Sequence, residues 1–197
     1  MADQTTAMPE ITLERVNTPP AQTWNYLRAN DITLTVPKLS RQGDVYFALP
    51  RLYDTIECGM GPKVTEWVTS QATDARYVEV RAGEVREEPI VVDVTAGNAQ
   101  DVGVMVRAGA EATIMVCARP TDGSQNESSP STSAALVRII AERDAKVHLL
   151  EFVMAHDNQQ HIESVGIRAA HNARIEVRQF FLGAAITAAG IATSLDG

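Results

Sequence analysis

A short segment recurs in the second half of the chain, and this repeat limits the possible folds more than any other feature. Three copies begin at Val106, Ile139 and Ile167. In each copy, alanine follows six positions later and aliphatic residues follow eight and ten positions later. A fourth, degenerate copy begins at Val80, and the three clear copies are spaced by 33 and 28 residues. Strand–turn–strand repeats of this length are typical of solenoids, in which each coil buries its apolar side against its neighbours.

Apolar and polar residues alternate within each copy. The aliphatic set of the first copy is Val104, Val106, Ala112, Ile114 and Val116, and the later copies repeat it. A period of two places this set on one face of the strands and the polar set on the other. An ordinary β-sandwich is the alternative fold. The solenoid is favoured because a sandwich need not keep small-residue turns at one offset from every strand.

The predicted fold is mainly β, with the solenoid over residues 77–197 and an N-terminal segment with short helices over residues 1–76. Strands are expected at 77–81, 90–94, 102–107, 112–117, 134–140, 146–153, 161–168 and 174–182. The Pro/Ser/Gly/Asn-rich stretch 119–133 predicts an exposed loop.

The N-terminal segment carries two helical patterns. One covers residues 21–28, after Pro19 and Pro20, and the other follows Gly61-Pro62, with Val64, Trp67 and Val68 on its apolar side. Residues 1–16 read as an irregular lead-in.

Charge and composition narrow the class of protein. The formal net charge is −8 and no Lys/Arg run is present, which disfavours nucleic-acid binding. Residues 1–10 are polar and unlike a signal peptide, and no apolar run approaches the roughly 20 residues of a membrane helix. We therefore expect a soluble, cytoplasmic protein, with no membrane partner and with both cysteines as free thiols.

Three segments resemble one known family. Residues 20–31 are similar to a segment near the start of SufB/SufD proteins, and residues 56–61 resemble a motif of shorter SufD-like proteins. Residues 89–93, followed by 104–113, look like the family's opening coils. The resemblance runs from about Pro20 to the end of the chain.

The resemblance implies a right-handed parallel β-helix that serves as a non-enzymatic scaffold for iron–sulfur cluster assembly. It also implies a SufB-like sister subunit and a SufC-like ABC ATPase as partners, with a transient cluster or iron as cargo. We expect a SufD-like role.

The chain departs from the family at its C-terminus. Family members continue the β-helix well beyond a segment like residues 183–197 and end in a helical region that contacts the ATPase. The best-attested cysteine and histidine of the family's subunit interface lie in that later part and have no counterpart here. A truncated chain is therefore expected, with an exposed last coil that leads to a homodimer, to strand addition or to poor solubility.

Cys117 is the weak candidate for handling sulfur, because SufB-like proteins carry a sulfur-accepting cysteine in roughly this region. The repeat places it beside Leu150 and Arg178, off the apolar face, and an incidental strand cysteine is the favoured interpretation. A packing or loop role is expected for Cys58. His148, on the polar face, could contribute to iron binding at a partner interface.

No catalytic residue and no metal site are predicted. His156 and His161 are expected to be solvated turn residues, since their spacing is not that of a zinc protease. Carboxylates are spread over several coils, at Asp93, Asp101, Glu111, Asp144, Glu151 and Glu163. The alternative function is a carbohydrate-active β-helix enzyme or sugar-binding module, based on fold analogy alone and disfavoured by the scarcity of aromatic residues.

Overall fold

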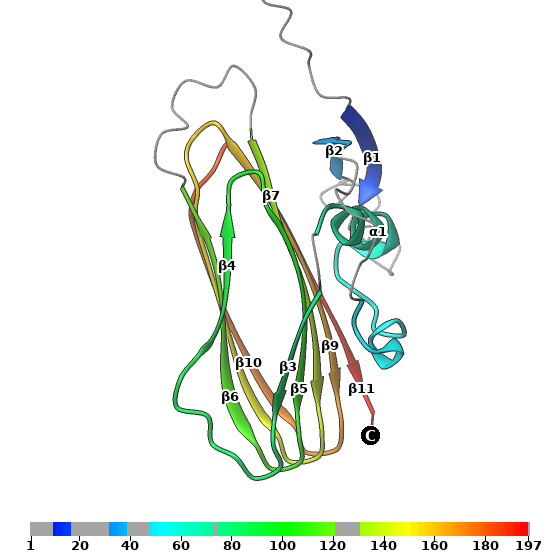
Figure 1. The fold of residues 1–197 in the computed structure, drawn as a ribbon, viewed down its shortest axis with the longest axis vertical. Helices are drawn as coiled ribbons and strands as arrows, with labels where there is room; N and C mark the ends of the chain where they lie inside the picture. Colours follow the sequence, from blue (N-terminus) through cyan, green and yellow to red (C-terminus); the bar gives the residue numbers. More distant parts are fainter. Residues whose placement is uncertain (1–9, 17–31, 39–47, 73–74, 121–130, 197) are drawn as a thin grey trace, which may run out of the picture.

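Nine strands of the chain wind into a flattened solenoid (Figure 1). The computed structural model describes residues 10–16, 32–38, 48–72, 75–120 and 131–196. The solenoid strands are β3 (Ala75–Val80), β4 (Ile90–Thr95), β5 (Ala99–Val106), β6 (Glu111–Arg119), β7 (Ser131–Ala141), β8 (Lys146–Met154), β9 (Gln159–Ala169), β10 (Arg174–Gly183) and β11 (Ile186–Leu195).

Each coil contributes one strand to each of two sheets. The five-stranded sheet has the order β11-β9-β7-β5-β3, and the four-stranded sheet has the order β10-β8-β6-β4. Every strand pair in both sheets is parallel. The predicted solenoid is therefore confirmed and the β-sandwich alternative is wrong, because antiparallel hairpins build a sandwich.

The small-residue turns of the repeat stack on one another at one end of the solenoid. Gly83, Gly109, Asp144 and Asn172 occupy equivalent turn positions, with φ of 71°, 67°, 61° and 59°. Glycine, asparagine and aspartate are the residues that adopt this left-handed conformation most easily. Backbone N–H groups also bind carbonyls of the next turn, as from Gly109 to Arg143 at 3.0 Å. Turn chemistry and coil-to-coil hydrogen bonding thus explain why the repeat keeps small or Asn/Asp residues here.

The space between the two sheets is filled by aliphatic side chains, as the alternation predicted. All of Val104, Val106, Ala112, Ile114 and Val116 are buried there, together with their counterparts on β7 and β8. On β10, which has a neighbour on only one side, the inward-facing Val177 is 37% exposed.

The register between the first and second clear copies differs from the predicted alignment by two residues. Ile139 pairs with Val104 and not with Val106, whereas Ile167 pairs with Ile139 as predicted. Because the error is an even number, each side chain keeps its predicted face. The burial prediction therefore held although the alignment was wrong.

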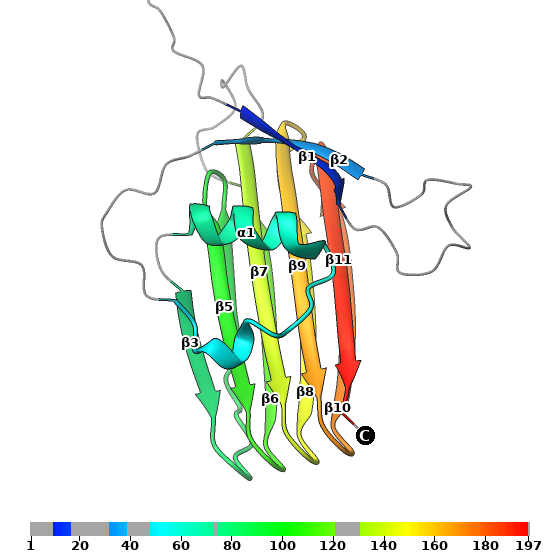
Figure 2. The same ribbon diagram turned by 90° about the vertical axis from the view of Figure 1, so that its right-hand side faces the viewer.

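The N-terminal segment covers the outer face of the five-stranded sheet (Figure 2). It comprises the antiparallel pair β1 (Glu10–Val16) and β2 (Ile32–Pro37), a 3-10 turn at Arg51–Tyr53, and helix α1 (Gly61–Gln71). The irregular lead-in predicted for residues 1–16 is wrong over β1. The helix predicted at 21–28 lies outside the described residues.

Helix α1 confirms the prediction made for the chain after Gly61-Pro62. Its buried side chains are Val64, Trp67 and Val68. The Trp67 indole N–H donates to the carbonyl of Pro37, at 3.1 Å, and so ties the helix to β2. Strand β11 was not predicted, because its Ala/Gly-rich sequence lacks the alternation of the earlier strands.

Glycines allow the N-terminal segment to approach the sheet at backbone distance. A Cβ at Gly59 would lie 2.1 Å from the backbone of Gly190, and one at Gly166 would lie 2.6 Å from the carbonyl oxygen of Glu57. The Gly59 N–H donates to the carbonyl of Val165 at 3.0 Å. The segment is therefore attached to β9 and β11 by close backbone packing as well as by its apolar side chains.

We expect Gly166→Ala to lower the free energy of unfolding by about 1–3 kcal/mol, because its Cβ meets a backbone atom that cannot rotate away. Gly103→Ala is the matched control on the same sheet face, since its Cβ meets the flexible side chain of Leu49 at 2.7 Å. Urea denaturation of both variants measures the difference. Equal losses would contradict the proposed backbone docking.

Candidate functional site

A cluster of polar side chains lies inside the solenoid, where aliphatic residues are otherwise the rule. Glu151 on β8 and His161 and Glu163 on β9 all occupy inward-facing positions. Their exposures are 0%, 0% and 1%. Buried charged residues are uncommon unless they are paired, so this cluster is the most unusual feature of the interior.

Neighbouring strands supply two hydrogen bonds to the cluster. The Nδ1 atom of His161 lies 2.9 Å from the hydroxyl oxygen of Ser133 on β7. The Gln179 side-chain amide on β10 donates to Oε2 of Glu151 at 2.5 Å. The cluster therefore joins β7, β8, β9 and β10 across both sheets.

Several polar atoms of the cluster have no hydrogen-bond partner among the described residues. They are Oε1 of Glu151, Nε2 of His161 and both carboxyl oxygens of Glu163. Nε2 of His161 and Oε2 of Glu163 are 3.5 Å apart. None of the ion pairs between described residues brings a lysine or arginine to either glutamate.

Burial decides the protonation of these groups. It raises the pKa of Glu163 to about 8, and together with the Glu163 carboxyl it raises the pKa of Glu151 to about 8. Burial also lowers the pKa of His161 to about 4. At neutral pH the cluster consequently consists of two protonated carboxyl groups and a neutral imidazole.

Within the part of the chain that the structure describes, no group of three or more His, Cys, Asp or Glu side chains could hold a metal ion. The chemistry that the cluster offers is the storage of protons.

Sequence reasoning missed this cluster. His161 is buried and is not a solvated turn residue, and Glu151 and Glu163 are brought together and not spread apart. The alternation rule contained the signal: Glu163 continues the inward series of Val165 and Ile167, and Glu151 continues that of Leu149. Extending the inward series of each strand by two more residues would have predicted that Glu151 and Glu163 face the interior.

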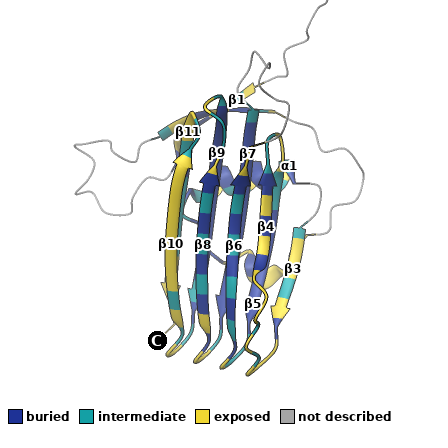
Figure 3. Cartoon of the chain, turned by 90° about the vertical axis from the view of Figure 1, so that its left-hand side faces the viewer, coloured by how far each residue is buried: buried dark blue, intermediate teal, exposed yellow. Residues whose placement is uncertain are grey.

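Cys117 lies on the outer face of the four-stranded sheet. Figure 3 looks onto this face. In the register it is flanked by Asp93 on β4 and Phe152 on β8. The prediction that Cys117 lies beside Leu150 and Arg178 is wrong by two residues. The cause is the same two-residue error in the alignment of the first and second copies that affected the interior. Phe152 stacks on Phe180 of β10, with ring centroids 4.8 Å apart.

The surroundings of Cys117 do not activate its thiol. Partial burial, followed by the nearby Asp93 carboxylate, raises the pKa of Cys117 above its usual value. Arg119, the nearest cation, is held by Asp93 through an Nε–Oδ1 hydrogen bond of 2.8 Å. The thiol is protonated at neutral pH, whereas a sulfur acceptor needs the thiolate.

His148 lies on the same outer face, nearer the stacked turns. Its Nδ1 is 3.0 Å from Oε2 of Glu176, and its Nε2 is 3.6 Å from Oε1 of Glu111. Thr113 and Arg178 help to line a shallow cleft of about 340 Å³ beside it. The geometry supplies a charged, partly exposed surface.

Cys58 belongs to the N-terminal segment and is buried against β9. It is 5% exposed, and its Sγ lies 3.6 Å from the carbonyl oxygen of Ile56. Burial raises its pKa. These contacts agree with the packing role expected from the sequence.

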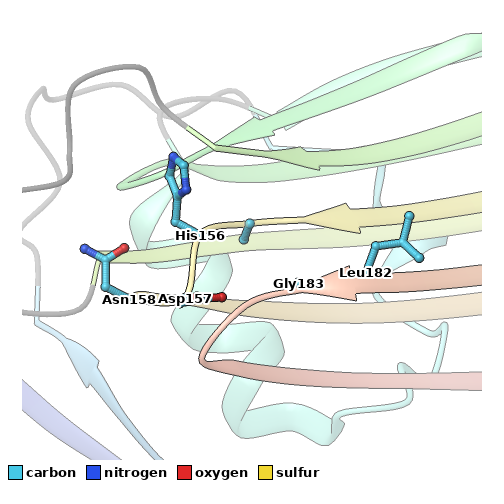
Figure 4. A pocket seen from close by; sticks show the side chains of 6 residues that line it. His156, Asp157, Asn158, Leu182 and Gly183 are labelled. Atoms are coloured by element: carbon cyan, nitrogen blue, oxygen red, sulfur yellow. The ribbon is translucent and has the colours of Figure 1, made fainter.

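The turn between β8 and β9 lines a cleft of about 390 Å³ together with Leu182 and Gly183 (Figure 4). In Figure 4 the side chains of His156, Asp157 and Asn158 point in different directions. The turn therefore offers no convergent set of ligands to one bound atom.

A comparison with protein families identifies the solenoid. Residues 91–197, more than half of the chain, match the model described as "SUF system FeS cluster assembly, SufBD core domain". The chain belongs to the SufBD family. No curated protein and no solved structure matched it. Family membership connects the chain to iron–sulfur cluster assembly by the SUF system.

Among the described residues, the only α-helix, α1, is too short to cross a membrane.

We expect alkylation of Cys117 by iodoacetamide to be slow at pH 7 and to increase only above the ordinary thiol pKa. The variant Cys58→Ser isolates Cys117, and Asp93→Asn, which removes the neighbouring negative charge, should shift the pH profile toward lower pH. Mass spectrometry measures the rate. Rapid alkylation near pH 7 would show that the thiol is activated after all.

Proposed function

We propose that this SufBD protein is a SufD-like, non-enzymatic scaffold subunit of the cytoplasm. It acts through surfaces that bind a SufB-like sister subunit and an ABC-type ATPase, and the iron–sulfur cluster or its iron is cargo of the complex. The observation that carries the proposal is family membership, combined with a solenoid in which partial burial and Asp93 raise the pKa of the Cys117 thiol.

The sequence and the site both support a role without turnover. Gly59-Met60-Gly61-Pro62-Lys63 lacks the P-loop pattern, so hydrolysis of ATP falls to a partner. The histidines His148 and His156 lie in separate clefts, and neither cleft has a serine or a cysteine among its lining residues.

The edge formed by β10 and β11 supports a role in binding other proteins. The inward-facing Phe181 is 47% exposed, and Ile186 is 48% exposed. Figure 3 shows that β10 is exposed along most of its length. An apolar edge of this kind is covered by another coil or by another subunit, because unpaired strand edges associate readily. A second copy of this chain is one such subunit.

Co-expression with a SufB-like subunit and its ATPase tests the proposal, with an affinity tag on this chain. We expect the three proteins to co-purify, and we expect Phe181→Asp to weaken retention of the SufB-like subunit by about tenfold or more. Val85→Asp is the matched control, since Val85 is 65% exposed at the opposite end of the solenoid and should tolerate the charge.

Absence of co-purification, together with unchanged cluster assembly when the gene is deleted, would refute the scaffold role. Light scattering of the isolated chain measures self-association at the same edge. A monomer at all concentrations would remove the homodimer from the proposal and leave the sister subunit.

A further inference from the structure

We propose that the polar cluster inside the solenoid is a pH-sensitive latch: the coils built from β8, β9 and β10 stay closed while Glu151 and Glu163 are protonated, and they loosen when these protons are lost. This inference goes beyond the scaffold role and does not depend on it.

The first basis of the latch is the arrangement of His161 and Glu163, whose side-chain polar atoms face each other. Nε2 of His161 and Oε2 of Glu163 are 3.5 Å apart, and neither has a hydrogen-bond partner within the described part of the chain. In the tautomer whose Nδ1–H donates to the Ser133 hydroxyl oxygen, 2.9 Å away, Nε2 of His161 carries a lone pair. Two lone pairs that face each other repel. A proton on Glu163 turns this repulsion into attraction.

The second basis is that the described residues bring no compensating cation to the cluster. The inward residues beside the cluster are all uncharged. They are Val116 of β6, Ser133 and Ala135 of β7, Val153 of β8, Gln159 of β9, Gln179 of β10, and Thr187 and Ala189 of β11. The Cys117 thiol, on the outer face of β6, is a further titratable group near Glu163. Nε2 of Gln159, a neutral donor, is buried with no hydrogen-bond partner among the residues that the structure describes, and it does not offset a negative charge.

An ionised carboxylate here would therefore be a buried charge with no counter-ion, which is among the most costly states in a protein interior. Ionisation of both carboxyl groups adds repulsion between them. Gln179, which holds Glu151, belongs to β10, and β10 has a strand neighbour on only one side. Separation of β10 from β8 would admit water to the charges.

The direction of the pH effect follows from proton binding. Between pH 4.5 and about 8 the unfolded chain has ionised both glutamates while the folded chain keeps their protons, so stability falls as pH rises. His161 acts in the opposite direction between pH 4 and 6.5, where only the unfolded chain binds its proton. The loss of stability is therefore steepest from pH 6.5 to about 8.

Hydrogen exchange measured by mass spectrometry at pH 6.5 and pH 8.5 tests the latch, with rates corrected for the intrinsic effect of pH. We expect protection factors in β8, β9 and β10 of the wild-type chain to fall by about tenfold or more. The double variant Glu151→Gln/Glu163→Gln, which keeps neutral side chains of the same shape, should show no such fall. Glu111→Gln, on the outer face, should behave as the wild type.

A parallel fall of protection in the wild type and in the double variant would overturn the proposal. If the double variant does not fold, Glu163→Gln alone must show a smaller fall than the wild type, and an equal fall overturns the latch. A loss of protection on adding EDTA at pH 6.5 would also overturn it, because a bound cation and not protons would then neutralise the carboxyl groups.

Discussion

Parallel stacking of one coil on the next is the interaction on which the rest of this structure depends. Backbone hydrogen bonds fix the distance between coils, and every inward side chain then rests on the residue at the same position of the neighbouring coil. Small aliphatic residues fill the thin space between the two sheets, which explains how a chain with 5% aromatic residues forms a continuous core. Among the described strands, β10 is paired on one side, to β8.

The two sheets use their outer faces differently. The five-stranded sheet carries glycines at outward positions, and these allow the chain before α1, between Leu49 and Met60, to lie against the strands. The four-stranded sheet instead presents rows of ion pairs, including Lys146 with Glu111, beside a short apolar row around Phe152. One face is thus packed by the chain itself, while the other displays side chains from every coil.

The polar cluster shows what parallel stacking imposes on an interior. A glutamate at an inward position cannot turn to solvent, because its strand is fixed on both sides by register. Its protonation must therefore adapt to the site, and the site favours the neutral acid. Glu151 and Glu163 consequently link the pH of the surroundings to the packing of the last coils.

The sequence by itself determined the solenoid, the inward and outward faces of most strands, and helix α1, because these follow from local periodicity and turn chemistry. It also pointed to the SufBD family. It did not determine the register between coils separated by the 119–133 stretch, since loop length sets that register and a shift of two residues preserves the alternation. Only the tertiary structure placed Phe152 beside Cys117 and enclosed His161 with two glutamates, because those neighbours come from different coils and depend on how the sheets close over them.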